Sequence, residues 1–149
     1  MDTPLRVLIV SGPGHYRDSL VALLRTIPRA DLTLADGDTL SRIDLSNRHT
    51  PSIVLVDLDS CAFDALGRLA SIKESCPAAR YLILVDNLRQ SQAAQGLGVD
   101  CVLPKSASAG EFLMAIRQLS SGHDHILKPR HDYAFLPAVD RMGSGIAGR

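Results

Sequence analysis

Two residues of this 149-residue chain have the types and positions that phosphoryl chemistry needs. Asp57 directly follows the apolar run 53–56, and Lys105 directly follows the run 101–104. A carboxylate can attack phosphorus as a nucleophile, while an ammonium beside it holds the oxygens of the transferred group. An aspartate and a lysine at strand ends are a weak signal when taken alone, so their meaning depends on the elements that position them.

Short β-branched runs alternate along the chain with segments of helical periodicity. The strand candidates are segments 6–10, 32–35, 53–56, 81–85 and 101–103. Three of them are almost continuous Val, Ile and Leu, which is typical of parallel strands covered on both faces. The helix candidates are segments 16–27, 40–43, 63–73, 91–97 and 108–122. In the last of these, Ser108 and Glu111 have the spacing of a capping box, and Gly122 is expected to end the helix.

Five β–α repeats predict an α/β fold, namely a doubly wound, five-stranded parallel sheet with the flavodoxin-like (βα)5 arrangement. The carboxyl ends of parallel strands meet at one edge of the sheet, and the functional crevice of such folds lies there. We therefore expect Asp57 and Lys105 to share one pocket, which Asp59 and Asp86 also face.

With these residues in place, the chain resembles the receiver domains of bacterial two-component response regulators (CheY-like), particularly those of the NarL/FixJ kind. The resemblance covers about residues 5–122. The stretches that carry it are 6–10, 16–20, 51–58, 98–100 and 103–106. The resemblance implies that Asp57 stands at the phosphoacceptor position and that Lys105 stands at the position that contacts the phosphoryl group.

The chain departs from the pattern of that family at several pocket positions. Where the family has an acidic pair that binds Mg²⁺, this chain has Ser11 and Gly12, which do not replace two carboxylates as hard oxygen ligands. Val85 stands in place of a hydroxyl residue after the fourth strand, and Val102 stands in place of an aromatic switch residue. We therefore expect a degenerate pocket with weak or absent Mg²⁺ binding, no metal site and no cofactor.

The resemblance implies a signalling module that is not an enzyme: an atypical receiver that acts through protein contacts or dimerisation. Transcription would be controlled by an output domain outside this chain, and DNA would be bound only through that domain. The expected partners are a histidine kinase or other signalling protein, and a second copy bound through the first and fifth helices (segments 16–27 and 108–122).

Three alternatives remain open at this point. The first is a phosphorylation-competent receiver that uses Asp57 as the aspartyl-phosphate acceptor. The second is a rearranged metal site built from Asp57, Asp59 and Asp86. The third is a flavodoxin-like cofactor binder that shares only the fold.

Composition limits the partners and the compartment. Sixteen basic and sixteen acidic residues cancel, so no overall field favours nucleic acid or an anionic membrane. The apolar runs are too short to span a bilayer, and the first residues do not form a signal peptide. Three cysteines without metal-ligand spacing are expected to be reduced thiols, which favours the cytoplasm. Residues 123–149 lack periodicity and are expected to be a linker or tail, either of a truncated regulator or of a stand-alone receiver.

Overall fold

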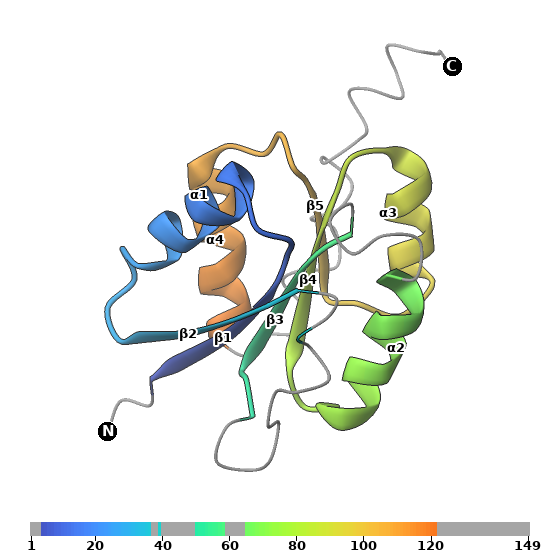
Figure 1. The fold of residues 1–149 in the computed structure, drawn as a ribbon, viewed down its shortest axis with the longest axis horizontal. Helices are drawn as coiled ribbons and strands as arrows, with labels where there is room; N and C mark the ends of the chain where they lie inside the picture. The colour runs from blue at the N-terminus through green and yellow to red at the C-terminus, as the bar shows by residue number, and fades with distance from the viewer. Residues whose placement is uncertain (1–3, 37–38, 40–49, 59–64, 122–149) are drawn as a thin grey trace.

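The computed structural model describes residues 4–36, 39, 50–58 and 65–121. Its elements are β1 (Leu5–Val10), α1 (His15–Leu24), β2 (Ala30–Ala35), β3 (Ile53–Asp57), α2 (Ala65–Ser75), β4 (Arg80–Val85), α3 (Leu88–Gln95), β5 (Cys101–Pro104) and α4 (Ala109–Ser120). All five strands are parallel and form one sheet in the order β2-β1-β3-β4-β5 (Figure 1). The sequence-based prediction of a five-stranded, doubly wound parallel sheet is thus confirmed.

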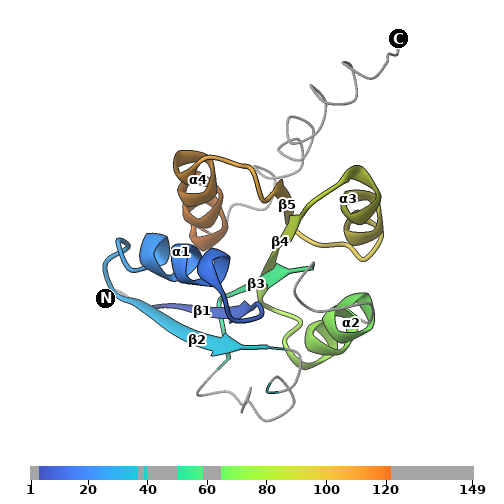
Figure 2. The same cartoon turned by 45° about the horizontal axis from the view of Figure 1, so that its top comes forward.

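Helices cover both faces of this sheet. Helices α1 and α4 lie on one face, and α2 and α3 lie on the other (Figures 1 and 2). Side chains of the central strand β3 alternate between two apolar clusters: Leu55 packs in the cluster with α1 and α4, whereas Val54 and Val56 pack in the cluster with α2 and α3. Because both faces are buried, β3 and β4 read in the sequence as continuous apolar runs.

The edge strand β2 begins two residues before its predicted start and runs from Ala30 to Ala35. It pairs on one side with β1, with Leu5 opposite Ala30 and Val10 opposite Ala35. Most of its side chains are exposed or half-buried, including Leu34. This exposure explains why its sequence is only half apolar and gave the weakest strand signal.

Two predicted helix boundaries lie about three residues from the observed ones, and a local hydrogen bond explains one of them. Helix α3 begins at Leu88 instead of 91, because the Asn87 side chain accepts a hydrogen bond from the backbone N–H of Gln90 (2.9 Å). Helix α1 ends at Leu24 instead of 27, and the chain then turns toward β2.

The capping box of α4 is confirmed. Ser108 Oγ accepts from the Glu111 N–H at 3.1 Å, and Glu111 Oε1 accepts from the Ser108 N–H at 2.9 Å. The helix ends at Ser120. Gly122, the predicted helix at 40–43 and the predicted tail at 123–149 lie outside the described residues.

The order of the sheet fixes where a functional crevice belongs. The chain runs outward from β1 to β2 and then returns past β1 to β3, so the direction of winding reverses between β1 and β3. In open α/β sheets the crevice lies beyond the carboxyl ends of the strands at such a reversal. Within the described part of the chain, no helix is both long and apolar enough to cross a membrane.

Candidate functional site

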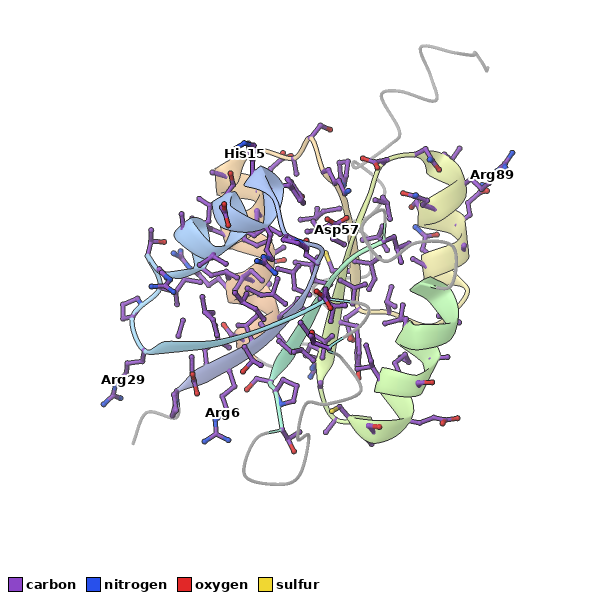
Figure 3. The ribbon with its side chains drawn as sticks, viewed as in Figure 1. Arg6, His15, Arg29, Asp57 and Arg89 are labelled. Carbon is purple, nitrogen blue, oxygen red and sulfur yellow. The ribbon has the colours of Figure 1, made fainter. Side chains whose placement is uncertain are left out.

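Asp57 is the last residue of β3, the strand beside this reversal. Its side chain is 1% exposed, and the next residue, Leu58, donates its N–H to Leu84 O of β4 at 3.2 Å. Figure 3 places Asp57 near the carboxyl end of the sheet, away from Arg6 and Arg29 at the opposite end. The backbone pairing on this side of β3 thus fixes the carboxylate at the centre of the crevice.

Lys105 reaches Asp57 from the end of β5. Its backbone N–H donates to Val85 O at 2.8 Å, which extends the pairing of β5 with β4 beyond the strand. From there the side-chain Nζ lies 2.6 Å from Asp57 Oδ1. The structure therefore brings the two sequence-predicted residues together as an ion pair, with the carboxylate buried and the lysine side chain 18% exposed.

Ser11 and Gly12 follow β1, on the other side of β3. Ser11 is buried, and its backbone N–H donates to Ala35 O at 2.9 Å. Its hydroxyl lies 3.1 Å from Asp57 Oδ2 and donates a hydrogen bond to it. Both carboxylate oxygens of Asp57 are therefore engaged, one by an ammonium and one by a hydroxyl, while Gly12 brings no side chain to the pocket.

Asp86 adds a second carboxylate to the pocket. It follows β4, and its Oδ2 lies 3.6 Å from Lys105 Nζ. Its side chain is 42% exposed, so water screens this contact more than the one to Asp57. The Asp86 backbone N–H donates to Gln90 Oε1 at 2.6 Å, which fixes the turn into α3. Asp59, the other predicted acid, lies outside the described residues.

Val85 and Val102 are fully buried in the apolar cluster with α2 and α3. Val102 is paired with Ile83 across the β4–β5 ladder, and Val85 is paired with Pro104. Neither side chain can donate or accept a hydrogen bond. The positions where the family has a hydroxyl and an aromatic ring are therefore filled here by packed aliphatic groups.

Tyr16 belongs to the pocket although its sequence position did not identify it. It is the second residue of α1, and the centroid of its ring lies 5.2 Å from Lys105 Nζ. Burial raises the pKa of the Tyr16 phenol well above its ordinary value, and the negative charges of Asp57 and Asp86 raise it further. Its helical spacing in the sequence also suits a buried apolar stripe. The feature that could have identified it as a pocket residue is its place as an aromatic residue in the first turn of the helix after β1.

The family implies a Mg²⁺ ion at this edge of the sheet, and the described residues do not fit one. Mg²⁺ requires several oxygen ligands in near-octahedral geometry. Here the Lys105 ammonium contacts Asp57 and Asp86. At the position where the family has an acidic metal ligand, the Ser11 hydroxyl donates a hydrogen bond to Asp57. Among the described residues, no group of three His, Cys, Asp or Glu side chains is placed to hold a metal ion.

Comparison with known proteins shows what the chain is similar to. No protein-family model matches it. The nitrate/nitrite response regulator protein NarP of Escherichia coli K12 is 30% identical over 122 residues, which are 80% of this chain and 57% of that protein. A protein-glutamate methylesterase/protein-glutamine glutaminase of Anaeromyxobacter dehalogenans is 27% identical over 74 residues, or 50% of this chain and 20% of that protein. The chain thus spans less than two thirds of each of these relatives.

Solved structures share the fold. The isolated receiver domain of RcsB from Salmonella enterica serovar Typhimurium superposes with a TM-score of 0.68 at 16% identity, covering 82% of this chain and 92% of that domain. The receiver domain of a putative response regulator NarL from Mycobacterium tuberculosis superposes with a TM-score of 0.67 at 19% identity, covering 82% of this chain and all of that domain. In sequence the chain is thus similar to the response regulator NarP, and in fold it is similar to the receiver domains of response regulators, the signalling domains of two-component systems.

Proposed function

We propose that this chain is an atypical receiver domain that signals through protein contacts and not through Mg²⁺-dependent phosphorylation of Asp57. The observation that carries the proposal is the Ser11 hydroxyl, which donates a hydrogen bond to Asp57 Oδ2 at 3.1 Å and leaves no carboxylate there to bind a metal ion. Ser11 and Gly12 stand where the family has its metal-binding acids. In this proposal residues 1–122 form the receiver and residues 123–149 form a linker or tail.

The charges of the pocket oppose an incoming phosphoryl donor. Two of the described groups named above, Asp57 and Asp86, are carboxylates that an anionic phosphodonor would have to approach. Two like charges about 4 Å apart repel by roughly 4 kcal/mol at an effective dielectric near 20. Without a divalent cation to offset this repulsion, an anionic phosphodonor is disfavoured beside Asp57, whose side chain is only 1% exposed.

A second copy of the chain is the partner that the face formed by α1 and α4 fits. Met114 of α4 is 57% exposed on this side of the molecule. A cavity of about 190 Å³ lies where the turn after α1 meets α4. Its lining includes the apolar residues Leu5, Ile27, Pro28 and Leu113 and the polar residues Thr26, Arg117 and Ser120. A twofold dimer would place the face formed by α1 and α4 against itself, which buries Met114 twice. The family resemblance implies a dimer through the first and fifth predicted helices, which are α1 and α4 of the structure.

An output domain completes the proposed pathway. The match to NarP, a nitrate/nitrite response regulator, covers 57% of that protein, so the relative carries a further region. We propose that the receiver described here controls transcription through such a region, and that DNA is bound there and not by the receiver. Its input would come from a histidine kinase or another signalling protein.

The first test is intact-protein mass spectrometry after incubation with acetyl phosphate and Mg²⁺. We expect no phosphoryl adduct on the wild-type protein, because the pocket lacks the oxygen ligands that Mg²⁺ needs. Asp57→Asn serves as the control for the attachment site. An adduct that forms on the wild type and disappears in Asp57→Asn would contradict the proposal.

The same measurement decides the alternative, a phosphorylation-competent receiver with Asp57 as acceptor. One observation favours that reading: Asp57 and Lys105 meet at the carboxyl edge of the sheet, where a nucleophile and a phosphate-binding ammonium are needed. If this alternative holds, the adduct will appear on the wild type and will be lost on removal of Mg²⁺.

The second test concerns dimerisation. We expect sedimentation velocity to show a concentration-dependent dimer, and Met114→Glu to weaken it by about tenfold or more, because a carboxylate would be buried in the interface. Ser71→Glu is the matched control, since Ser71 is an exposed residue of α2 on the opposite face. Equal dissociation constants for wild type and Met114→Glu would exclude the α1–α4 face as the dimer surface.

A further inference from the structure

The cavity of about 190 Å³ between the turn after α1 and helix α4 lies at the amino end of the sheet, and we call it the amino-end cavity. One of its walls is the first residue of β1, whereas Asp57 is the last residue of β3. Figure 3 shows Arg29, which follows the turn residue Pro28 of the lining, at the end of the sheet away from Asp57. The apolar part of the lining consists of Leu5, Ile27, Pro28, Leu113 and Ile116.

Hydrogen bonds within the backbone hold the walls of this cavity. The Leu5 N–H donates to Arg29 O at 3.1 Å, which ties the start of β1 to the turn. The two residues before Pro28 donate to carbonyls of the last turn of α1, and proline itself has no N–H. The remaining lining residues belong to α4, where each N–H is used by the helix. The backbone of the lining is therefore fixed, and its N–H groups are not available to a ligand.

The polar side chains of the lining leave one donor group for a ligand. Thr26 Oγ1 donates to Leu23 O at 2.6 Å, and Ser120 Oγ donates to Arg117 O at 2.8 Å, so both hydroxyls serve the ends of helices. Arg117 is the charged residue of the lining. Among the residues that the structure describes, no carboxylate is paired with its guanidinium. The lining thus offers a cationic donor that lacks an acceptor.

This combination of groups specifies the chemistry of a ligand. A guanidinium binds a carboxylate through two parallel hydrogen bonds. A closed apolar cavity of roughly 150 Å³ is large enough for benzene, so the amino-end cavity has room for a group of that size. The lining contains no acidic residue, and Arg25 and Arg29, on either side of the lining turn, are basic and exposed. The complement of the cavity is therefore an anion with an apolar body.

We propose that the amino-end cavity binds a small carboxylic acid whose apolar body has about six to eight carbon atoms, with the Arg117 guanidinium holding the carboxylate. The site goes beyond the proposed function, because it lies at the opposite end of the sheet from Asp57 and Lys105 and uses neither of them. The walls supply the apolar contact, and the arginine supplies the selection for negative charge.

NMR titration of the full chain with benzoate tests the site. We expect saturable shifts of the backbone amides of Leu5, Thr26, Leu113 and Ser120, at millimolar concentrations of benzoate, because so small a ligand has few atoms to contribute binding energy. The amide of Lys105 should not move. Shifts that gather around Lys105, or the absence of a saturable shift, would overturn the proposal.

Two further probes separate the charge of benzoate from its ring. Benzyl alcohol keeps the ring but carries no charge, and acetate keeps the carboxylate but has no ring. We expect each to bind at least about tenfold more weakly than benzoate, because each loses one of the two interactions. Acetate binding as tightly as benzoate would mean that the guanidinium alone is contacted. Benzyl alcohol binding equally well would mean that the cavity does not select carboxylates. Either result overturns the proposed ligand class.

Substitution of Arg117 tests the residue assigned to the carboxylate. Arg117→Met keeps a long side chain without the charge, and we expect it to weaken benzoate binding about five- to tenfold while benzyl alcohol binding stays within twofold. Arg117→Lys should give an intermediate affinity, since it restores the charge but not the planar fork. Arg89→Met is the matched control, because Arg89 is exposed on α3, on the other face of the sheet (Figure 3). If Arg117 served only the end of α4, Arg117→Met would bind benzoate as the wild type does, which would overturn the assignment.

The proposed dimer uses the same two helices, so the benzoate titration is repeated on Met114→Glu. Met114 is exposed and lies outside the lining of the cavity. Binding to both proteins supports the site. Binding to Met114→Glu alone also supports it, and means that the dimer covers the cavity. Binding to neither protein overturns the site, whereas a wild type that stays monomeric overturns only the dimer.

Discussion

At the scale of the single residue, Asp57 is defined by what its two oxygens contact. Oδ1 is paired with the Lys105 ammonium, and Oδ2 accepts a hydrogen bond from the Ser11 hydroxyl. A buried carboxylate is tolerated only when it is paired and hydrogen-bonded, and here both conditions are met. The same contacts that make the buried charge tolerable also occupy the oxygens that a metal ion and a phosphoryl group would need.

Strand ends made most of these contacts predictable from the sequence. Asp57, Lys105 and Asp86 follow apolar runs, and parallel pairing brings the carboxyl ends of such runs to one edge. The contact with Tyr16 was not predictable in the same way, because it depends on the rotation of α1 about its axis and on where that helix begins. Periodicity alone assigns Tyr16 equally well to a purely apolar stripe.

Restoring the acidic pair is the sharpest single-residue test of why the pocket is atypical. We expect the double variant Ser11→Asp/Gly12→Asp to gain Mg²⁺ binding, because two carboxylates would then stand beside Asp57. Without Mg²⁺ its melting temperature should fall through like-charge repulsion, and Mg²⁺ should restore it. Intact mass after treatment with acetyl phosphate should show an adduct only when Mg²⁺ is present.

The matched control for that variant adds the same two charges elsewhere. Ser19 and Ala22 are exposed on α1, so Ser19→Asp/Ala22→Asp changes the net charge equally without entering the pocket. The control should behave as the wild type does toward Mg²⁺ and acetyl phosphate. If the pocket variant also shows no Mg²⁺-dependent rise in melting temperature, the loss of the acidic pair is not what disables metal binding.

At the scale of the element, burial decided which parts of the fold could be read from the sequence. Strands β3 and β4 are buried on both faces and were found within one residue of their observed ends, whereas the exposed edge strand β2 gave a weak signal. Helix boundaries depended on caps. The capping box of α4 was visible as Ser108 and Glu111, while the single Asn87 cap of α3 was not recognised and its start was misplaced.

Helix α4 offers a direct measure of what such a cap contributes. Ser108→Ala removes the hydroxyl that accepts from the Glu111 N–H, and we expect it to lower the free energy of unfolding by about 1 kcal/mol. Urea titration followed by circular dichroism gives this value. Ser106→Ala is the control, because Ser106 is an exposed serine two residues away and outside the cap. Equal losses in the two variants would show that the capping bond adds nothing.

At the scale of the whole molecule, the two faces of the sheet stand in different relations to the pocket. On the face with α2 and α3, the positions next to the pocket are the packed aliphatic residues Val85 and Val102. On the face with α1 and α4, Tyr16 contacts the Lys105 ammonium and packs into the core of that face. The charged centre is therefore linked by specific contacts to the same helices that we propose for dimerisation.

Alkaline titration tests whether the Tyr16 phenol is buried beside the charged pocket, and the stability of the whole protein is the quantity that reports it. The pKa values of Tyr16 and Tyr81 are raised above the ordinary value of 10.0, in both cases first through burial. Below that pH both the folded and the unfolded chain keep the phenolic protons, so the tyrosines add no pH dependence. As the pH rises through about 10, the unfolded chain releases these protons while the folded chain retains them. Stability should therefore be full below about pH 9 and should fall as the pH rises toward 11.

The contribution of Tyr16 to this fall is separable. In Tyr16→Phe one ionisable phenol has been removed. The free energy of unfolding, measured by urea titration between about pH 9 and 11, should therefore depend less steeply on pH, by an amount that corresponds to up to one proton released on unfolding. Tyr81→Phe should produce a similar decrease from the opposite face of the sheet, where Tyr81 donates to Cys76 O at 2.7 Å. A slope that Tyr81→Phe reduces and Tyr16→Phe leaves unchanged would mean that the Tyr16 phenol titrates as a solvated group, and that the ring does not lie in the charged and buried surroundings from which its contact with Lys105 follows.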